Sequence, residues 1–146
     1  MLRDNQPHPQ SSVIAGAVTV GDKGIAELNS GTIKENGIPI EEANLNSGDA
    51  DYKIGGAVAV RSGGSLTVND GVDISSNSGN YGGAILAYST SWENPANSAQ
   101  EAAVVSIKGG RLSGNTAQRG GGGIFASGNT RLNVSGGVVS KNKTRS

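Results

Sequence analysis

Apolar residues along this chain occur in short runs of three to five positions, many of them alternating with polar residues. The clearest examples lie at 57–60, 65–68 and 72–75, and Gly, Asn, Asp or Ser bounds each run. Alternation over so few positions between turn-forming residues is typical of short β-strands. Because strands this short are marginal alone, we expect them to be stabilised by pairing with other parts of the chain. The pattern predicts an all-β fold.

Two short phrases recur along the chain. The first is a small-residue turn followed by Ala or Gly and an aliphatic residue, found at 15–18, 55–58, 82–85 and 120–124. The second, after each copy, has two apolar residues two apart, then a Gly, then an apolar residue three positions before an Asn. That Asn is Asn36, Asn77, Asn115 or Asn142. A unit repeated in this way indicates a stacked array.

The repeat predicts a right-handed parallel β-helix, a β-solenoid of about four rungs. Each unit has about 25 residues once two loop insertions, at 37–53 and 88–102, are set aside. A unit of three short strands cannot bury its own apolar side, whereas stacked units can. Residues 13–146 then form one domain behind a polar tail, 1–12. Equivalent residues such as Val58, Ile85 and Ile124 should align inside the coil.

The repeated Asn and Gly residues are expected to make the corners. Asn adopts the left-handed backbone region more readily than other residues except Gly. Its amide can also hydrogen-bond to the rungs above and below. We therefore interpret the four Asn residues as a structural ladder. The paired Gly residues provide a second corner, where positive φ or close backbone approach is needed.

Composition removes several classes of protein. Gly accounts for 24 of the 146 residues, about twice the usual share, and this argues against a helical bundle. No apolar run approaches the length of a membrane-spanning helix. The 12 basic and 12 acidic residues balance, so the chain lacks the overall basic excess of a nucleic-acid-binding protein. Cys is absent, and the polar N-terminus shows no leader.

The repeated pair of phrases resembles the GGA[ILV] and FxxN repeats of chlamydial polymorphic outer membrane proteins and related bacterial surface β-helix proteins. The first half matches literally at 55–58 and 82–85, while Ile33, Ile74, Leu112 and Val139 replace the Phe of the second half. The resemblance covers residues 14–142. It implies a secreted, surface-displayed, autotransporter-like segment that acts in adhesion, with a membrane-anchoring barrel outside this segment.

Few residues suggest chemistry. Asp70 and Asp73 are the closest carboxylate pair in a strand-turn region, but Asp-Gly is an ordinary turn dipeptide, and we assign no catalytic residue. In the first insertion, Asp49 and Asp51 are candidate calcium ligands, because alternating oxygen atoms around a Gly can wrap that ion. A solvated acidic loop explains the same residues without a metal. The sequence indicates no other cofactor.

The second insertion contains the candidate ligand-binding aromatics, Tyr88 and Trp92. Such a pair can stack on a sugar or anchor a protein, or it can fold back over the coil. We expect a non-enzymatic structural or adhesive segment that binds a glycan or a host surface protein. The alternative is a divergent or truncated polysaccharide lyase or glycoside hydrolase of the pectin-lyase-like class. The open ends should contact neighbouring rungs of a longer array or a partner chain.

Overall fold

The computed structural model describes residues 1–5, 13–37, 53–89 and 102–145. Within these ranges the regular structure consists of β-strands without a helix, and every strand pair is parallel. The expectation of an all-β chain built from parallel strands is confirmed. Parallel pairing follows from the repeat, because equivalent strands run in the same direction on each pass of the chain.

The strands form three main sheets and two small ones. The first sheet contains β3 (Val18–Val20), β7 (Val58–Arg61), β11 (Ile85–Ser89) and β15 (Ile124–Gly128). The second contains β4 (Ile25–Leu28), β8 (Ser65–Val68), β12 (Ala103–Ile107) and β16 (Thr130–Val134). The third contains β1 (Leu2–Arg3), β5 (Gly31–Lys34), β9 (Val72–Ser75), β13 (Arg111–Ser113) and β17 (Val138–Ser140). The corner sheet contains β10 (Ser78–Tyr81), β14 (Thr116–Gly120) and β18 (Lys143–Thr144), and β2 (Val13–Ala15) pairs with β6 (Lys53–Gly55).

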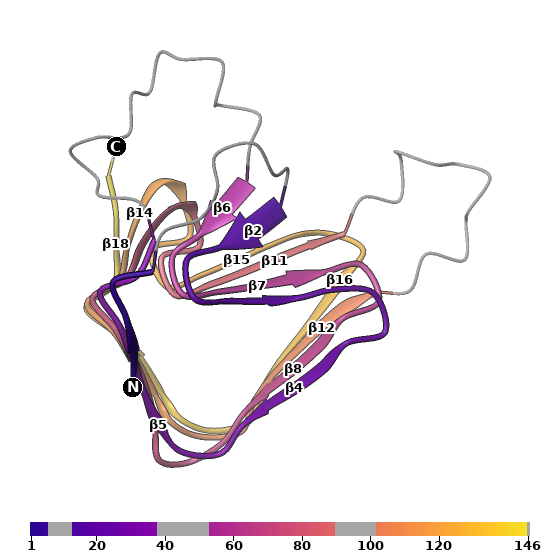
Figure 1. The fold of residues 1–146 in the computed structure, drawn as a ribbon, viewed down its shortest axis with the longest axis horizontal. Helices are drawn as coiled ribbons and strands as arrows, with labels where there is room; N and C mark the ends of the chain where they lie inside the picture. The colour runs from indigo at the N-terminus through magenta and orange to yellow at the C-terminus, as the bar shows by residue number, and fades with distance from the viewer. Residues whose placement is uncertain (6–12, 38–52, 90–101, 146) are drawn as a thin grey trace.

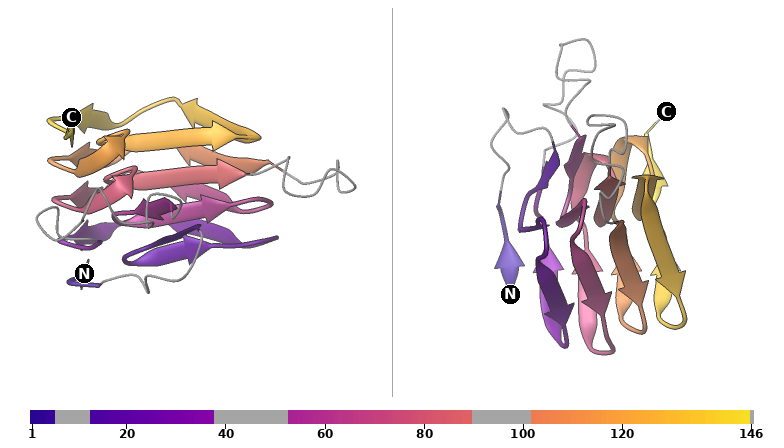
Figure 2. Two further views of the ribbon diagram at one scale, coloured as in Figure 1. Left: turned by 90° about the horizontal axis from the view of Figure 1, so that it is seen from above. Right: turned by 90° about the vertical axis from the view of Figure 1, so that its right-hand side faces the viewer.

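The chain passes through the first, second and third sheets in the same order each time, and we call one such pass a winding. Four windings are complete: β3–β4–β5, β7–β8–β9, β11–β12–β13 and β15–β16–β17. Seen along the stack, the three sheets enclose a three-sided space (Figure 1). Seen from the side, the windings lie one above another from the N-terminal to the C-terminal end (Figure 2).

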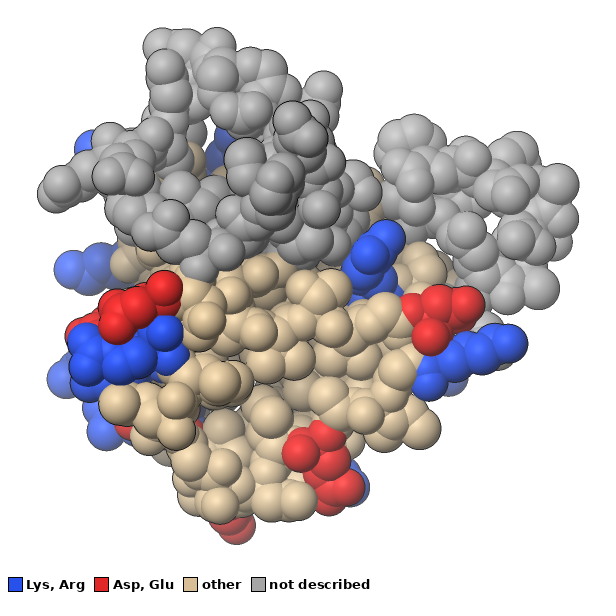
Figure 3. Space-filling model, in the orientation of Figure 1, with Lys and Arg blue, Asp and Glu red and all other residues tan. Residues whose placement is uncertain are grey.

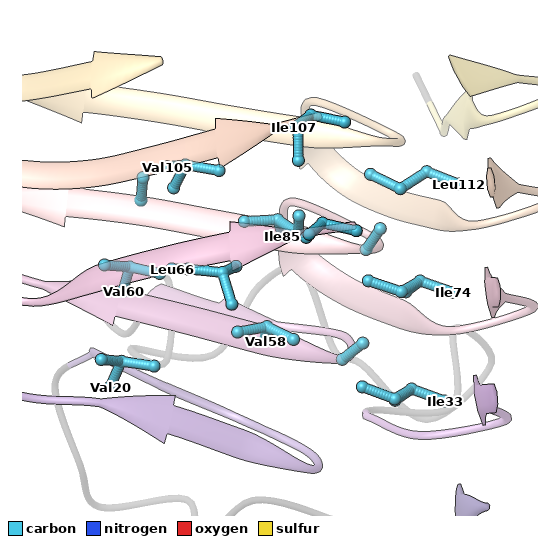
Figure 4. Packing of buried hydrophobic residues seen from close by; sticks show 14 of the residues in the cluster. Val20, Ile33, Val58, Val60, Leu66, Ile74, Ile85, Val105, Ile107 and Leu112 are labelled. Carbon is cyan, nitrogen blue, oxygen red and sulfur yellow. The ribbon is translucent and has the colours of Figure 1, made fainter. Parts of the chain in front are cut away.

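Equivalent apolar residues form continuous columns inside the windings. Val58, Ile85 and Ile124 are partners in register in the first sheet, as the repeat predicts. Val58 and Ile85 are fully buried, and Ile124 packs against the same core. In the third sheet a parallel column runs through Ile33, Ile74 and Leu112 (Figure 4). The core therefore lies between the three sheets, and each sheet contributes side chains to it.

The structure places strands at two positions where the sequence suggested a tail or a loop. The tail predicted over 1–12 is not wholly a tail, because Leu2–Arg3 forms β1 beneath β5. The second insertion was expected to begin at residue 88, but β11 continues to Ser89, so Tyr88 belongs to a strand. Five residues pair across β11 and β15 in register, which extends this strand beyond its apolar core. The remainder of both insertions, 38–52 and 90–101, lies outside the described residues.

The sharp backbone corner also differs from the expectation for Asn. Positive φ occurs at the residue immediately before each of the four repeated Asn residues, namely Glu35 (57°), Ser76 (56°), Gly114 (65°) and Lys141 (55°), and also at Asp4 (58°), which precedes Asn5. The Asn residues are not among those with positive φ. The preceding residue makes the turn, and this leaves the Asn side chain directed along the stack.

Candidate functional site

The Asn residues form one continuous column, which we call the Asn ladder. The backbone N–H and Nδ2 of Asn36 both donate to Oδ1 of Asn77, at 3.0 Å each. Asn77 donates in the same way to Asn115, at 3.0 Å each, and Asn115 to Asn142, at 2.9 Å each. Asn5 adds a further step, with donors 3.0 and 2.8 Å from Oδ1 of Asn36.

Each ladder Asn also reaches back to the preceding winding. Nδ2 of Asn77 donates to the carbonyl of Ile33, and Nδ2 of Asn115 to the carbonyl of Ile74, at 3.0 and 2.9 Å. These carbonyls belong to the apolar column that precedes each Asn by three positions. With the apolar-x-x-Asn spacing, the amide of Asn77 can donate both to a carbonyl of the strand below it and to the Asn above it. Below Asn142, the side-chain amides from Asn36 to Asn115 find their partners within the stack.

The outer face of the first sheet carries a second apolar cluster. Side chains alternate along these strands, so Ala59, Leu86 and Phe125 share one outward-facing row between the inward-facing residues. Ala59 and Leu86 are nevertheless fully buried. They pack with Ala15 and with the partly buried Tyr81, Tyr88 and Phe125. Such cover on the outside of the sheet gives this face a rigid base.

The aromatic rings in this cluster come from different windings. The ring centroids of Tyr81 and Phe125 are 4.8 Å apart, with 51° between the ring planes. A tilted pair at this separation is a favourable aromatic arrangement. Close packing is also enforced at Gly120, where an added Cβ would lie 3.1 Å from the Phe125 ring. Tyr81 and Tyr88 therefore pack against buried side chains on the outer face of the first sheet.

Tyr88 lies in register with Arg61 on one side and with Ser127 on the other. Arg61 is exposed and Tyr88 is half-buried. Neighbouring strands are about 4.8 Å apart, so a phenol ring and a guanidinium group project from adjacent positions of one outer face. We call Arg61, Tyr88 and Ser127 the Tyr88 row. Beside it, the hydroxyls of Ser62 and the fully buried Ser89 are 2.9 Å apart and join two windings.

The carboxylates considered from sequence lie on another side of the molecule. Asp70 is exposed in the turn between β8 and β9, while Asp73 is half-buried on β9. Oδ1 of Asp73 is buried and lacks a hydrogen-bond partner among the described residues. Arg111 is the partner of Asp73 in register on β13, but its Nε donates to Oγ of Ser113, at 3.0 Å. The third sheet thus holds one underused carboxylate oxygen near a basic side chain.

Three candidate residues lie outside the described part of the chain: Trp92, Asp49 and Asp51. Among the residues that are described, no group of three His, Cys, Asp or Glu side chains is placed to hold a metal. The described part of the chain also lacks a helix long and apolar enough to cross a membrane.

Arg61 and Phe125 are the residues that sequence reasoning missed. A signal was present for Arg61, which follows Ala57 by four positions just as Tyr88 follows Ala84. Aligning the repeats would have placed the two side chains in one row. Phe125 follows Ile124 in the outward-facing position, which the same alignment identifies.

A scan against protein-family models and searches of curated proteins and of solved structures found no match for this chain.

Proposed function

We propose that the chain is a right-handed parallel β-helix that serves as a non-enzymatic structural and adhesive segment and binds a glycan on the Tyr88 row. The handedness follows from the right-handed twist of strands, which also favours right-handed parallel crossovers. The observation that supports binding is the half-exposed Tyr88 in register with the exposed Arg61 on a packed sheet.

The chemistry of the Tyr88 row suits a sugar. A phenol ring offers a flat apolar face and a polar hydroxyl, which together match the mixed surface of a pyranose. The guanidinium group of Arg61 can donate two parallel hydrogen bonds to a carboxylate. Because both side chains project from a paired sheet, no backbone segment has to be ordered on binding, and the main entropic cost is that of fixing the Arg61 side chain. An acidic glycan, such as one containing uronic acids, is the ligand class that uses both groups.

The proposed setting is the surface or secreted fraction of a bacterium. Its support is the resemblance of the repeated GGA and apolar-x-x-Asn phrases to those of bacterial surface proteins. A stack of windings is suited to that setting because it displays rows of side chains at fixed spacing along a rigid body. A host surface protein is the other partner class for the same face.

The test is binding of the purified protein to an array of neutral and uronate-containing glycans. We expect Tyr88→Ala and Arg61→Ser to weaken binding roughly tenfold each, the loss of one stacking contact or charged hydrogen bond. Arg131→Ser is the matched control, because Arg131 is also exposed but lies on β16 in the second sheet. The proposal fails if the variants bind as tightly as the wild-type protein, or if the wild-type protein retains no glycan.

A polysaccharide-cleaving enzyme is the second candidate, and the buried, unpartnered Oδ1 of Asp73 beside Arg111 is the observation that favours it. A buried polar atom without a hydrogen-bond partner calls for an explanation, and a role in catalysis is one such explanation. Incubation with pectins, alginates and glycosaminoglycans, followed by detection of shortened chains, tests this idea. Cleavage that disappears in Asp73→Asn would replace the adhesive proposal, and the absence of cleavage by folded protein would end the enzymatic one.

A further inference from the structure

The C-terminal winding leaves inward-facing apolar side chains exposed, at positions whose equivalents in the windings below are buried. Leu132, Val134 and Val139 are exposed by 41%, 57% and 48%. Their partners one winding below, Val105, Ile107 and Leu112, are fully buried. In the described part of the chain, no strand pairs with the outer edges of β15, β16 and β17. We call this surface the C-terminal face.

The Asn ladder is also open at this face. In the windings below, the backbone N–H and Nδ2 of each Asn donate to Oδ1 of the next Asn. Asn142 uses Nδ2 toward the carbonyl of Leu112, at 3.0 Å, and its backbone N–H has no partner among the described residues. The face therefore offers donors aligned for the Oδ1 of one more Asn.

Charge distinguishes this end of the molecule. Residues 102–146 contain seven basic residues and no Asp or Glu, whereas residues 1–101 contain five basic and all twelve acidic residues. Arg131, Lys141 and Lys143 belong to the last winding and its corner. The balanced total of the chain conceals this asymmetry. Figure 3 views the stack from its N-terminal end, where acidic and basic side chains lie together at the margins.

We propose that the C-terminal face docks an extended acidic polypeptide, which adds parallel strands along β16 and β17 with aliphatic side chains inward and carboxylates outward. Open strand edges are templates for such addition, in which main-chain hydrogen bonds supply affinity and alternate side chains supply specificity. The basic last winding favours carboxylates on the outward-facing positions. An Asn at the corner of the added segment accepts the donors of Asn142.

The N-terminal end of a second copy does not meet this description. Its β1 lies one winding below β3 and β4, because β1 pairs with β5 in the third sheet. If β1 of the copy paired with β17, no strand in the described part of that copy would pair with the outer edges of β15 and β16. A segment that supplies strands for the second and third sheets together fits the exposed columns.

The chain itself provides a matched pair of probe peptides. Residues 65–79 carry inward Leu66, Val68 and Ile74 and the corner Asn77, with a charge of −2 from Asp70 and Asp73. Residues 104–117 carry the equivalent inward residues and Asn115, with a charge of +2 from Lys108 and Arg111. End-capped, labelled forms of the two peptides differ mainly in the sign of their charge.

The experiment measures binding of each peptide to the whole protein by fluorescence anisotropy. We expect the acidic peptide to bind roughly tenfold or more tightly than the basic one at low ionic strength, with a difference that shrinks as salt screens the charges. Leu132→Asn combined with Val134→Asn should weaken binding of the acidic peptide about tenfold. Val138→Asn is the control, because Val138 is 56% exposed but in register with the outward-facing Arg111.

Any of three results with the peptides overturns the proposal: equal affinity for both peptides, no binding of either, or an unchanged affinity in the double variant that melts like wild-type protein. Competition with heparin separates the remaining alternative. If heparin displaces the acidic peptide and binds the double variant as well as the wild-type protein, the face takes polyanions and the proposal is wrong. The Tyr88 row is not involved, so the two binding tests are independent.

Discussion

A single asparagine side chain connects three windings of this molecule. Asn77 accepts two hydrogen bonds from Asn36 below it, donates to Asn115 above it, and also donates to the carbonyl of Ile33. Asn77 is only 1% exposed to solvent. A buried amide with its partners in place contributes specificity as well as stability, because any shift of the stack leaves several polar groups unsatisfied.

Replacing Asn77 by Leu should therefore lower the free energy of unfolding by on the order of 3–5 kcal/mol, since several buried groups lose their partners. Asn142→Leu is the matched variant at the open end, and its loss should be on the order of 1–2 kcal/mol because fewer buried partners are left unsatisfied. Urea unfolding followed by circular dichroism measures both. Equal losses would show that the ladder does not act through connections on both sides.

At the scale of the elements, the connections between strands hold two kinds of glycine. Gly114 has φ +65°, and an added Cβ there would meet only Oγ of Ser76, at 3.9 Å. Gly83 has no positive φ, but an added Cβ would overlap the carbonyl oxygen of Gly122 in the next winding and lie 2.6 Å from the Thr116 nitrogen. The first glycine permits a backbone turn, and the second permits two windings to approach each other.

The two substitutions to Ala should differ accordingly. Gly114→Ala should destabilise by about 1 kcal/mol, the cost of placing an ordinary residue in the left-handed region. Gly83→Ala should cost on the order of 3 kcal/mol or more, because packed backbone in an adjacent winding must move. Thermal melts of both variants test the ranking. A larger loss at Gly114 would mean that backbone conformation, not the approach of windings, limits this corner.

At the scale of the whole molecule, the described windings lie in a stack, and each winding pairs with the windings next to it. Stability in such an array is the sum of interactions within windings and between neighbours. The β7–β8–β9 and β11–β12–β13 windings are covered on both sides, whereas the outer edges of β15, β16 and β17 are unpaired in the described part of the chain. Local opening should begin where a neighbour is missing.

Hydrogen exchange should therefore be graded along the stack. We expect the backbone amides of β8, β9, β12 and β13 to exchange slowest, and those of β16, β17 and the two-residue β1 to exchange much faster. Mass spectrometry of peptic fragments resolves these segments. Uniform protection from one end to the other would indicate that the molecule opens as a single cooperative unit.

The sequence by itself determined which residues face inward and where the corner amides stand. The apolar alternation and the apolar-x-x-Asn step are local patterns, and each strand is short enough for the pleat to decide the direction of its side chains. Val58, Ile85 and Ile124 could thus be placed in one column before any contact was known. The same reasoning placed Asn36, Asn77, Asn115 and Asn142 at equivalent corners.

Only the tertiary structure decided which residues outside the repeated motifs join these columns and which side chains stay exposed. Asn5 follows Leu2 by the same three positions that separate Ile33 from Asn36, but the rest of the repeat does not precede it. It joins the ladder because β1 pairs with β5. Aligning the repeats would have placed Tyr88 beside Arg61, but that Arg61 is exposed and Tyr88 half-buried follows only from how the strands pack. The basic residues of 102–146 gather at one end of the molecule because stacking places successive windings one after another along an axis. Neighbours in a stack are set by the lengths of the connecting loops and by strand register, which no local pattern specifies.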